Sequence, residues 1–105
     1  MFYILEGKVP KRVTLEEWVN GNRYRPDADE SWRVAQTYIG DIQISTVFLG
    51  LDHNHNDYGL PLVFETMVFR GPMDDWCERY STWEEAEKGH QEIVEKVQAL
   101  LVTTS

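Results

Sequence analysis

The chain has 105 residues, of which 42% are hydrophobic and four are tryptophan, which is enough for one hydrophobic core and too little for a second. We therefore expect a single domain over residues 1–105. The net charge of −8 is opposite in sign to a surface that binds duplex DNA, so direct binding to duplex DNA is not expected. Residues 1–25 hold five basic and three acidic side chains, so the acidity lies beyond them, where it would attract a basic partner.

Several sequence features bear on the compartment and on cofactors. The single cysteine, Cys77, cannot form an intrachain disulfide, which suggests a reducing environment. No apolar run approaches the ~18 residues of a membrane span, and none follows a basic region as in a secretory signal. The chain also has no Gly-rich phosphate loop and no Cys-x-x-Cys pair. We expect a cytoplasmic protein that neither contacts a membrane nor uses a cofactor.

The beginning of the chain predicts two edge strands and a short helix. Residues 2–5 and 8–13 are strand-like, and Pro10 places the second segment at a sheet edge because proline has no N–H to donate. A Thr-x-x-Glu capping pattern follows, which predicts a helix over residues 15–20 that stops at Gly21. The polar stretch after it is expected to be an exposed loop.

Three segments rich in β-branched and aromatic residues predict an antiparallel meander. Residues 32–39 and 42–49 are joined by Gly40 and Asp41, a two-residue connection suited to a tight hairpin. Residues 60–69 form the next segment, which most simply pairs antiparallel with the one before it.

Apolar side chains occur on both faces of these strands. Ile42, Ile44 and Phe48 share one face, whereas Val47 and Leu49 share the other. A sheet with one solvated face would instead alternate apolar and polar residues. Both faces therefore need cover, one from the C-terminal helix and the other from the N-terminal segment or a second copy of the chain. The second option predicts a homodimer.

The end of the chain predicts one more strand and the longest helix. Residues 76–80 are strand-like, and a second capping pattern at Thr82 opens a helix over residues 83–101. Its apolar stripe consists of Ala86, His90, Ile93, Val94, Val97 and Leu101. We predict an α+β fold, in which an antiparallel β-sheet of three to five strands carries the long C-terminal helix on one face and a short N-terminal helix precedes it.

The polar loop between the second and third strands is one candidate site. His53, His55 and Asp57 could bind a divalent transition metal, which would acidify a bound water and make the protein a hydrolase. The same residue types are ordinary turn formers. The loop is therefore a plain turn, a metal site, or a ligand- or partner-binding loop that also uses Asp52 and Tyr58.

Three other residues call for explanation. Glu65 interrupts an apolar strand, where a carboxylate is costly unless paired. It is a perturbed acid in a pocket, a carboxylate that faces water at the sheet edge, or a partner of Arg33 or Arg70. His90 lies in the apolar stripe of the last helix, which favours a core histidine over a ligand. Cys77 has no nearby histidine in the sequence, which favours a buried, inert thiol.

A basic cluster near the N-terminus is the remaining candidate. Aromatic residues interleave its cations, and together they could stack a base and hold a phosphate, or they could simply be surface. If this cluster binds a ligand, the acidic remainder of the chain favours a nucleotide over duplex DNA. The cluster consists of Lys8, Lys11, Arg12, Arg23 and Arg25.

Three sequence blocks resemble a family of short proteins encoded by bacteriophages and prophages. The blocks are STVFLGLDH (45–53), PLVFETMVF (61–69) and RYSTWEEAEKGH (79–90). The resemblance implies no catalytic residue. His53 belongs to the shared block, whereas His55 and Asp57 depart from it, which weakens the metal hypothesis.

The resemblance implies a role in binding, inside the cytoplasm of the infected host. We expect an inhibitor that offers negative charge to the basic surface of a host protein, either a defence protein or one that handles nucleic acid. A sponge that binds a nucleotide signal at an oligomer interface is the first alternative. The metal-dependent hydrolase that uses His53 and His55 is the second.

Overall fold

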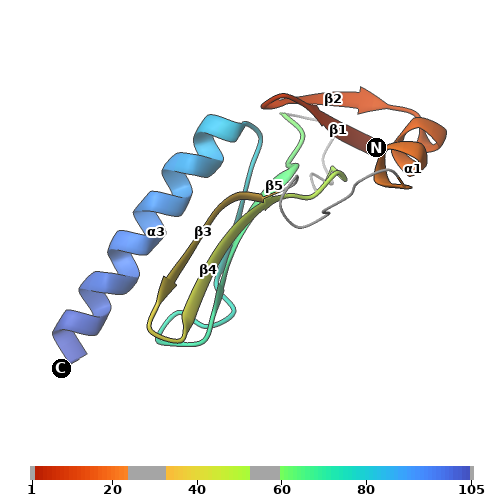
Figure 1. The fold of residues 1–105 in the computed structure, drawn as a ribbon. Coiled ribbons are helices and arrows are strands. Elements are labelled where there is room, and N and C mark those ends of the chain that lie inside the picture. The colour runs from red at the N-terminus through yellow and green to blue at the C-terminus, as the bar shows by residue number, and fades with distance from the viewer. Residues whose placement is uncertain (1, 24–32, 53–59, 105) are drawn as a thin grey trace.

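Two antiparallel sheets and two helices make up the fold, which confirms the predicted α+β class (Figure 1). The computed structural model describes residues 2–23, 33–52 and 60–104, with side chains over 2–19, 33–52 and 60–102. In chain order the elements are β1 (Phe2–Glu6), β2 (Val9–Val13), α1 (Leu15–Arg23), β3 (Arg33–Ile39), β4 (Ile42–Phe48), β5 (Phe64–Phe69), β6 (Cys77–Tyr80) and α3 (Trp83–Thr104).

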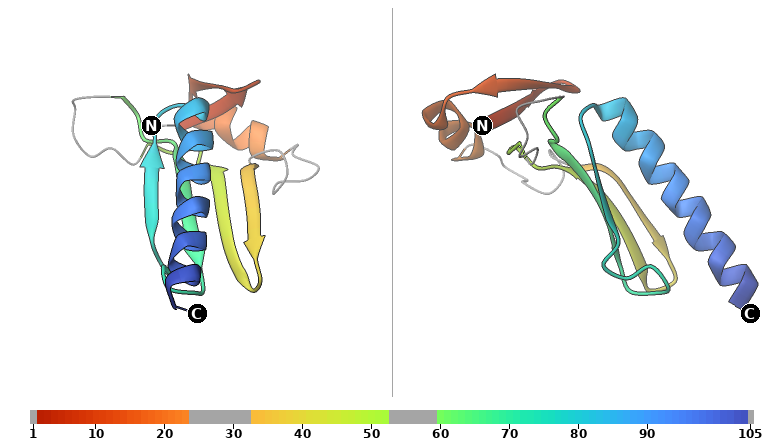
Figure 2. Two further views of the ribbon diagram at one scale, coloured as in Figure 1. Left: turned by 90° about the vertical axis from the view of Figure 1, so that its left-hand side faces the viewer. Right: turned by 180° about the vertical axis from the view of Figure 1, so that it is seen from behind.

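The larger sheet is a meander in the order β3-β4-β5-β6, with every neighbouring pair antiparallel. Gly40, with φ of 60°, provides the positive φ in the turn from β3 to β4, as expected for a tight hairpin. Helix α3 lies along one face of this sheet, while β1 and β2 form a separate hairpin beyond one end of it (Figure 2). The predicted strand order and helix placement are both confirmed.

Three element boundaries differ from the prediction by three or more residues. Helix α1 continues through Gly21 to Arg23, because a helical glycine costs only about 1 kcal/mol and need not end the helix. Strand β5 begins at Phe64 rather than at residue 60. Helix α3 extends to Thr104, three residues beyond its predicted end.

The Thr-x-x-Glu pattern forms a capping box at α1 and a threonine N-cap at α3. At α1 the amide of Glu17 donates to Thr14 Oγ1 at 3.2 Å, and the amide of Thr14 donates back to Glu17 Oε1 at 3.4 Å. At α3 the amide of Glu85 donates to Thr82 Oγ1 at 3.1 Å. These bonds satisfy amides that a helix start otherwise leaves unpaired, so the local sequence fixes where each helix begins.

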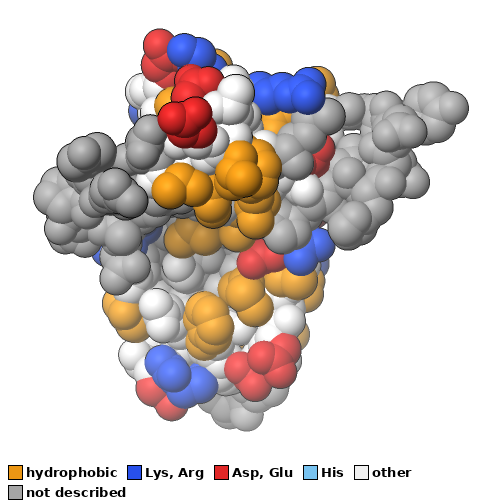
Figure 3. Space-filling model, turned by 90° about the vertical axis from the view of Figure 1, so that its right-hand side faces the viewer, with side chains coloured by type: hydrophobic (Ala, Val, Ile, Leu, Met, Phe, Trp, Pro, Cys, Tyr) orange, Lys and Arg blue, Asp and Glu red, His pale blue; other side chains and the backbone are white. Residues whose placement is uncertain are grey.

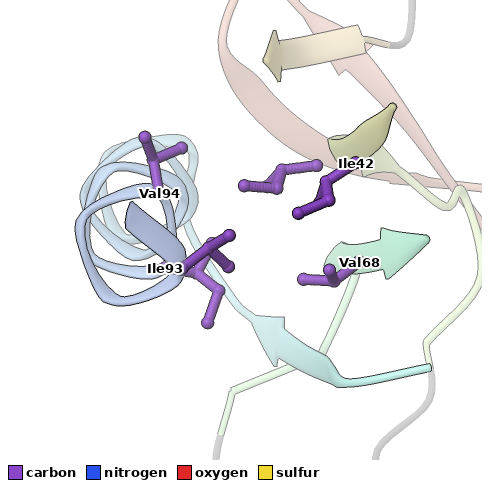
Figure 4. Packing of buried hydrophobic residues seen from close by; sticks show 6 residues of the cluster. Ile42, Val68, Ile93 and Val94 are labelled. Carbon is purple, nitrogen blue, oxygen red and sulfur yellow. The ribbon is translucent and has the colours of Figure 1, made fainter. Parts of the chain in front are cut away.

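The core between α3 and the sheet consists of two apolar clusters. Figure 4 shows the first, in which Ile42 and Val68 of the sheet point toward Ile93 and Val94 of α3. Ile44 and Val97 complete its buried set. The second cluster lies nearer the start of α3 and consists of Phe48, Val63, Phe64, Tyr80 and Ala86. The apolar stripe predicted for the last helix therefore faces the sheet.

The N-terminal hairpin is attached to the end of the sheet next to the start of α3. The amide of Tyr3 donates to the carbonyl of Gly50 at 2.9 Å, and Tyr3 and Leu5 pack against the second apolar cluster. The ammonium of Lys8 lies 5.6 Å from the ring centroid of Trp83, a cation–π contact. The hairpin thus extends the core lengthwise.

Gly89 of α3 is expected to tolerate no side chain. A Cβ placed there would lie 2.2 Å from the hydroxyl oxygen of Tyr80. Alanine normally stabilises a helix relative to glycine by about 1 kcal/mol. Here the overlap reverses the sign, so Gly89→Ala should lower the free energy of unfolding in urea by about 2 kcal/mol. Lys88→Ala, at the exposed neighbouring position, is the control; a stabilised G89A variant would contradict this packing.

Candidate functional site

Most of the residues proposed for the histidine loop and the basic cluster cannot be placed. Those outside the described residues are His53, His55, Asp57, Tyr58 and Arg25, together with the side chain of Arg23. Within the described part of the chain, no three His, Cys, Asp or Glu side chains lie close enough to hold a metal ion. The metal and nucleotide hypotheses thus remain predictions from sequence.

Asp52, the first residue of the proposed loop, has a structural contact. Its Oδ1 accepts a hydrogen bond of 2.9 Å from the backbone amide of Leu62. Nearby, the amide of Leu49 donates to the carbonyl of Val63 at 2.7 Å. These two bonds join the chain before the loop to the chain after it, so Asp52 helps to close the base of the loop.

Glu65 forms an ion pair on the sheet, but with a partner other than the two predicted. Its Oε2 lies 2.9 Å from Nε of Arg79, which is its cross-strand neighbour in the β5–β6 register. Arg33 is two strands away, because Val47 pairs with Arg33 on one side and with Glu65 on the other. The Nε of Arg70 instead donates to the carbonyl of Asp41. Glu65 is therefore a paired carboxylate.

His90 is the centre of a buried polar network that links α3 to the sheet. Its Nε2 lies 2.8 Å from Oγ1 of Thr37 on β3, and its Nδ1 lies 2.7 Å from Oγ1 of Thr46 on β4. Thr46 is in turn hydrogen-bonded to Thr66 on β5. A neutral imidazole has one donor and one acceptor nitrogen, and two threonine hydroxyls can satisfy both.

The network is a structural feature, as predicted for His90. Thr46 and Thr66 have no exposed surface, and His90 is 5% exposed. A substrate could not reach these atoms without separating the helix from the sheet. Desolvation by burial lowers the pKa of His90 below its ordinary value, because the charged imidazolium would lose its hydration.

Tyr80 lies where β6 meets α3, beneath a concentration of negative charge. Burial raises the pKa of its hydroxyl, while a hydrogen bond with Thr66 acts in the opposite direction. The hydroxyl of Tyr80 donates to Oε2 of Glu78 on β6 at 3.5 Å, and the negative charges of Glu78 and of Glu92 on α3 raise its pKa further. Acidic side chains from two elements therefore converge on this edge of the fold.

These two glutamates belong to a larger group that we call the acidic edge. Between residues 74 and 95 the chain has eight acidic side chains and two basic ones, so this stretch alone carries −6 of the net −8. All eight are exposed, on the turn before β6, on β6 itself and on α3. The acidic edge consists of Asp74, Asp75, Glu78, Glu84, Glu85, Glu87, Glu92 and Glu95.

Sequence reasoning placed the negative charge beyond residue 25 without locating this concentration. The local excess of carboxylates along the last third of the sequence would have been enough to locate it. What the sequence could not supply is that β6 lies beside α3, so that the charges of Glu78 and Glu92 both act on the hydroxyl of Tyr80 (Figure 2). The acidic edge is the described surface that best fits a binding role, because it unites most of the net charge on adjoining elements.

Comparison of the chain with protein-family models, with curated proteins and with solved structures finds no match. The helices of the described residues include none that is both long enough and apolar enough to span a membrane.

We expect acid to destabilise the fold through His90. Because its pKa is lowered in the folded state, the unfolded chain binds the proton more readily. The free energy of unfolding should therefore fall as the pH drops from ~7.5 to ~5.5, above the range where most carboxylates titrate.

His90→Gln is the matched variant for this measurement, since it keeps polar atoms at the position but cannot titrate. Urea unfolding of both proteins at several pH values isolates the contribution of His90 from that of the other two histidines. The variant should be less stable at pH ~7.5 and should show a flatter pH profile. Parallel profiles for the two proteins would show that His90 does not govern the acid response.

Proposed function

We propose that this protein acts by binding, with the acidic edge docking on a basic surface of a protein that serves in host defence or handles nucleic acid. The observation that carries the proposal is the concentration of eight exposed carboxylates on the turn before β6, on β6 and on α3. Surfaces that bind nucleic acid are positively charged, and an array of carboxylates can occupy them in place of phosphates.

Two further observations support a binding role over catalysis. The buried imidazole of His90 is engaged on both nitrogens and closed to substrates. Glu65, the other candidate acid, is held in its ion pair with Arg79. Among the described side chains, the groups best suited to acid–base chemistry are thus committed to holding the fold together.

The proposal is tested by affinity capture from host lysate at increasing salt. Charge pairing between exposed groups is screened by ions, so capture of the partner should weaken steeply between ~50 and ~500 mM salt. The captured protein should be basic, and added duplex DNA should compete with the acidic protein for it. A partner that remains bound at high salt and is indifferent to DNA would overturn the proposal, and so would an empty capture.

A charge-neutralised variant makes the test specific to the acidic edge. The triple variant Glu84→Gln, Glu92→Gln and Glu95→Gln should bind the captured partner roughly tenfold more weakly, since three exposed charge pairs at ~0.5 kcal/mol each amount to about 1.4 kcal/mol.

The matched control removes the same charge elsewhere, with Glu6→Gln, Glu16→Gln and Asp41→Asn. These exposed residues lie outside the acidic edge. The control should retain most of the affinity. Equal losses in the two triple variants would mean that net charge alone, rather than this surface, governs binding.

A further inference from the structure

The sheet face turned away from α3, which we call the open face, carries large apolar side chains among polar ones and is uncovered among the described residues. The molecule measures 51 × 34 × 20 Å, and its shortest dimension corresponds to one helix layer on one sheet. Figure 3 shows hydrophobic side chains gathered on this side of the molecule, between charged ones. By strand register the open face comprises Arg33, Gln36, Tyr38, Gln43, Ser45, Val47, Glu65, Met67, Phe69, Cys77 and Arg79.

The apolar residues of the open face form a cross-strand patch. Tyr38 is 60% exposed and Phe69 is 36% exposed, and both stand opposite Gln43 on the central strand β4. Met67 lies on β5 opposite Cys77 on β6. The thiol of Cys77 is exposed, so the prediction of a buried thiol was wrong. Large exposed apolar groups on neighbouring strands are unfavourable in water, and a sheet face of this kind is normally packed against another layer.

Four of the polar side chains on the open face are paired with one another. The side-chain amide of Gln36 is hydrogen-bonded to the hydroxyl of Tyr38, and Glu65 is paired with Arg79. A covering layer therefore need not provide matching groups for these four side chains. This favours a partner surface of the same mixed character, as a second open face would provide.

Charge also favours a second copy. Two molecules of net charge −8 repel each other, most strongly through their acidic edges. The open face carries Arg33, Arg79 and Glu65, a net charge of +1, so two copies that approach through this face bring no excess of negative charge together. In that arrangement the two α3 helices lie on the outside, because each covers the opposite face of its own sheet.

We propose that the open face is the interface of a homodimer, in which two sheets stack face to face. The four strands, spaced ~4.8 Å apart and from ~13 to ~23 Å long, cover roughly 380 Å² in projection. A standard interface buries ~800 Å² per partner, so the dimer is weak, with a dissociation constant in the micromolar range. This interface is separate from the acidic edge and does not depend on the function proposed for it.

Sedimentation equilibrium of the full chain tests the proposal. The mass should rise from 12.3 kDa toward twice that value as the concentration increases from ~1 µM to ~1 mM. Tyr38→Glu places a charge in the interface and should weaken self-association at least tenfold, whereas Val9→Glu, at a 66% exposed strand position on the distant hairpin, should leave it unchanged. Added salt should strengthen the dimer by screening the net charge, the opposite of its expected effect on capture of a basic partner.

Alkylation of Cys77 gives a second measurement that does not rely on a substitution. Because the chain has one cysteine and it lies on the open face, the rate of reaction with a thiol reagent reports on this surface alone. The rate should fall severalfold as the wild-type protein becomes concentrated, and it should stay constant for folded Tyr38→Glu. A single 12.3 kDa species at all concentrations overturns the proposal, as does a dimer that is indifferent to Tyr38→Glu and leaves Cys77 fully reactive.

Discussion

The imidazole of His90 holds the long helix to the sheet, and the two halves of the core are arranged around it. It contacts Thr37 and Thr46 on adjacent strands, and Thr46 continues the chain of hydrogen bonds to Thr66. On α3, β4 and β5 this polar seam separates the buried residues of the two apolar clusters: Thr46 stands between Ile44 and Phe48 on β4, for example. Apolar packing alone could let α3 slide along the sheet, whereas the hydrogen bonds are satisfied in one register only.

The two sides of this arrangement have contrasting surfaces. The acidic edge gathers carboxylates from the turn before β6, from β6 and from α3, and it is exposed and strongly charged. The open face is nearly neutral, and four of its polar side chains are paired with one another. Association through the acidic edge should weaken as salt is added, whereas association through the open face should strengthen, because one depends on charge and the other on apolar burial.

The candidate residues for chemistry have mostly structural contacts where the structure describes them. Asp52 closes the base of a loop through the amide of Leu62, and Glu65 is paired with Arg79. His90 is buried beneath α3 and hydrogen-bonded on both ring nitrogens. The same side chain can be a catalytic group or a structural one. Which of the two it is depends on whether a substrate can reach it and on its neighbours in the fold, and the sequence alone specifies neither.

The sequence by itself determined the α+β class, the order of the strands and the starts of both helices. These depend on local patterns: period-two strands, the three-and-four spacing from Ala86 to Leu101, and capping pairs three residues apart, as at Thr82 and Glu85. Only the tertiary structure decided which face of the sheet α3 covers, since apolar residues occur on both. That choice left Cys77 exposed, placed Glu65 beside Arg79 rather than Arg33, and made the charges of Glu78 and Glu92 act on the same hydroxyl, that of Tyr80. Each outcome depends on strand register and layer packing, which join residues far apart in the chain.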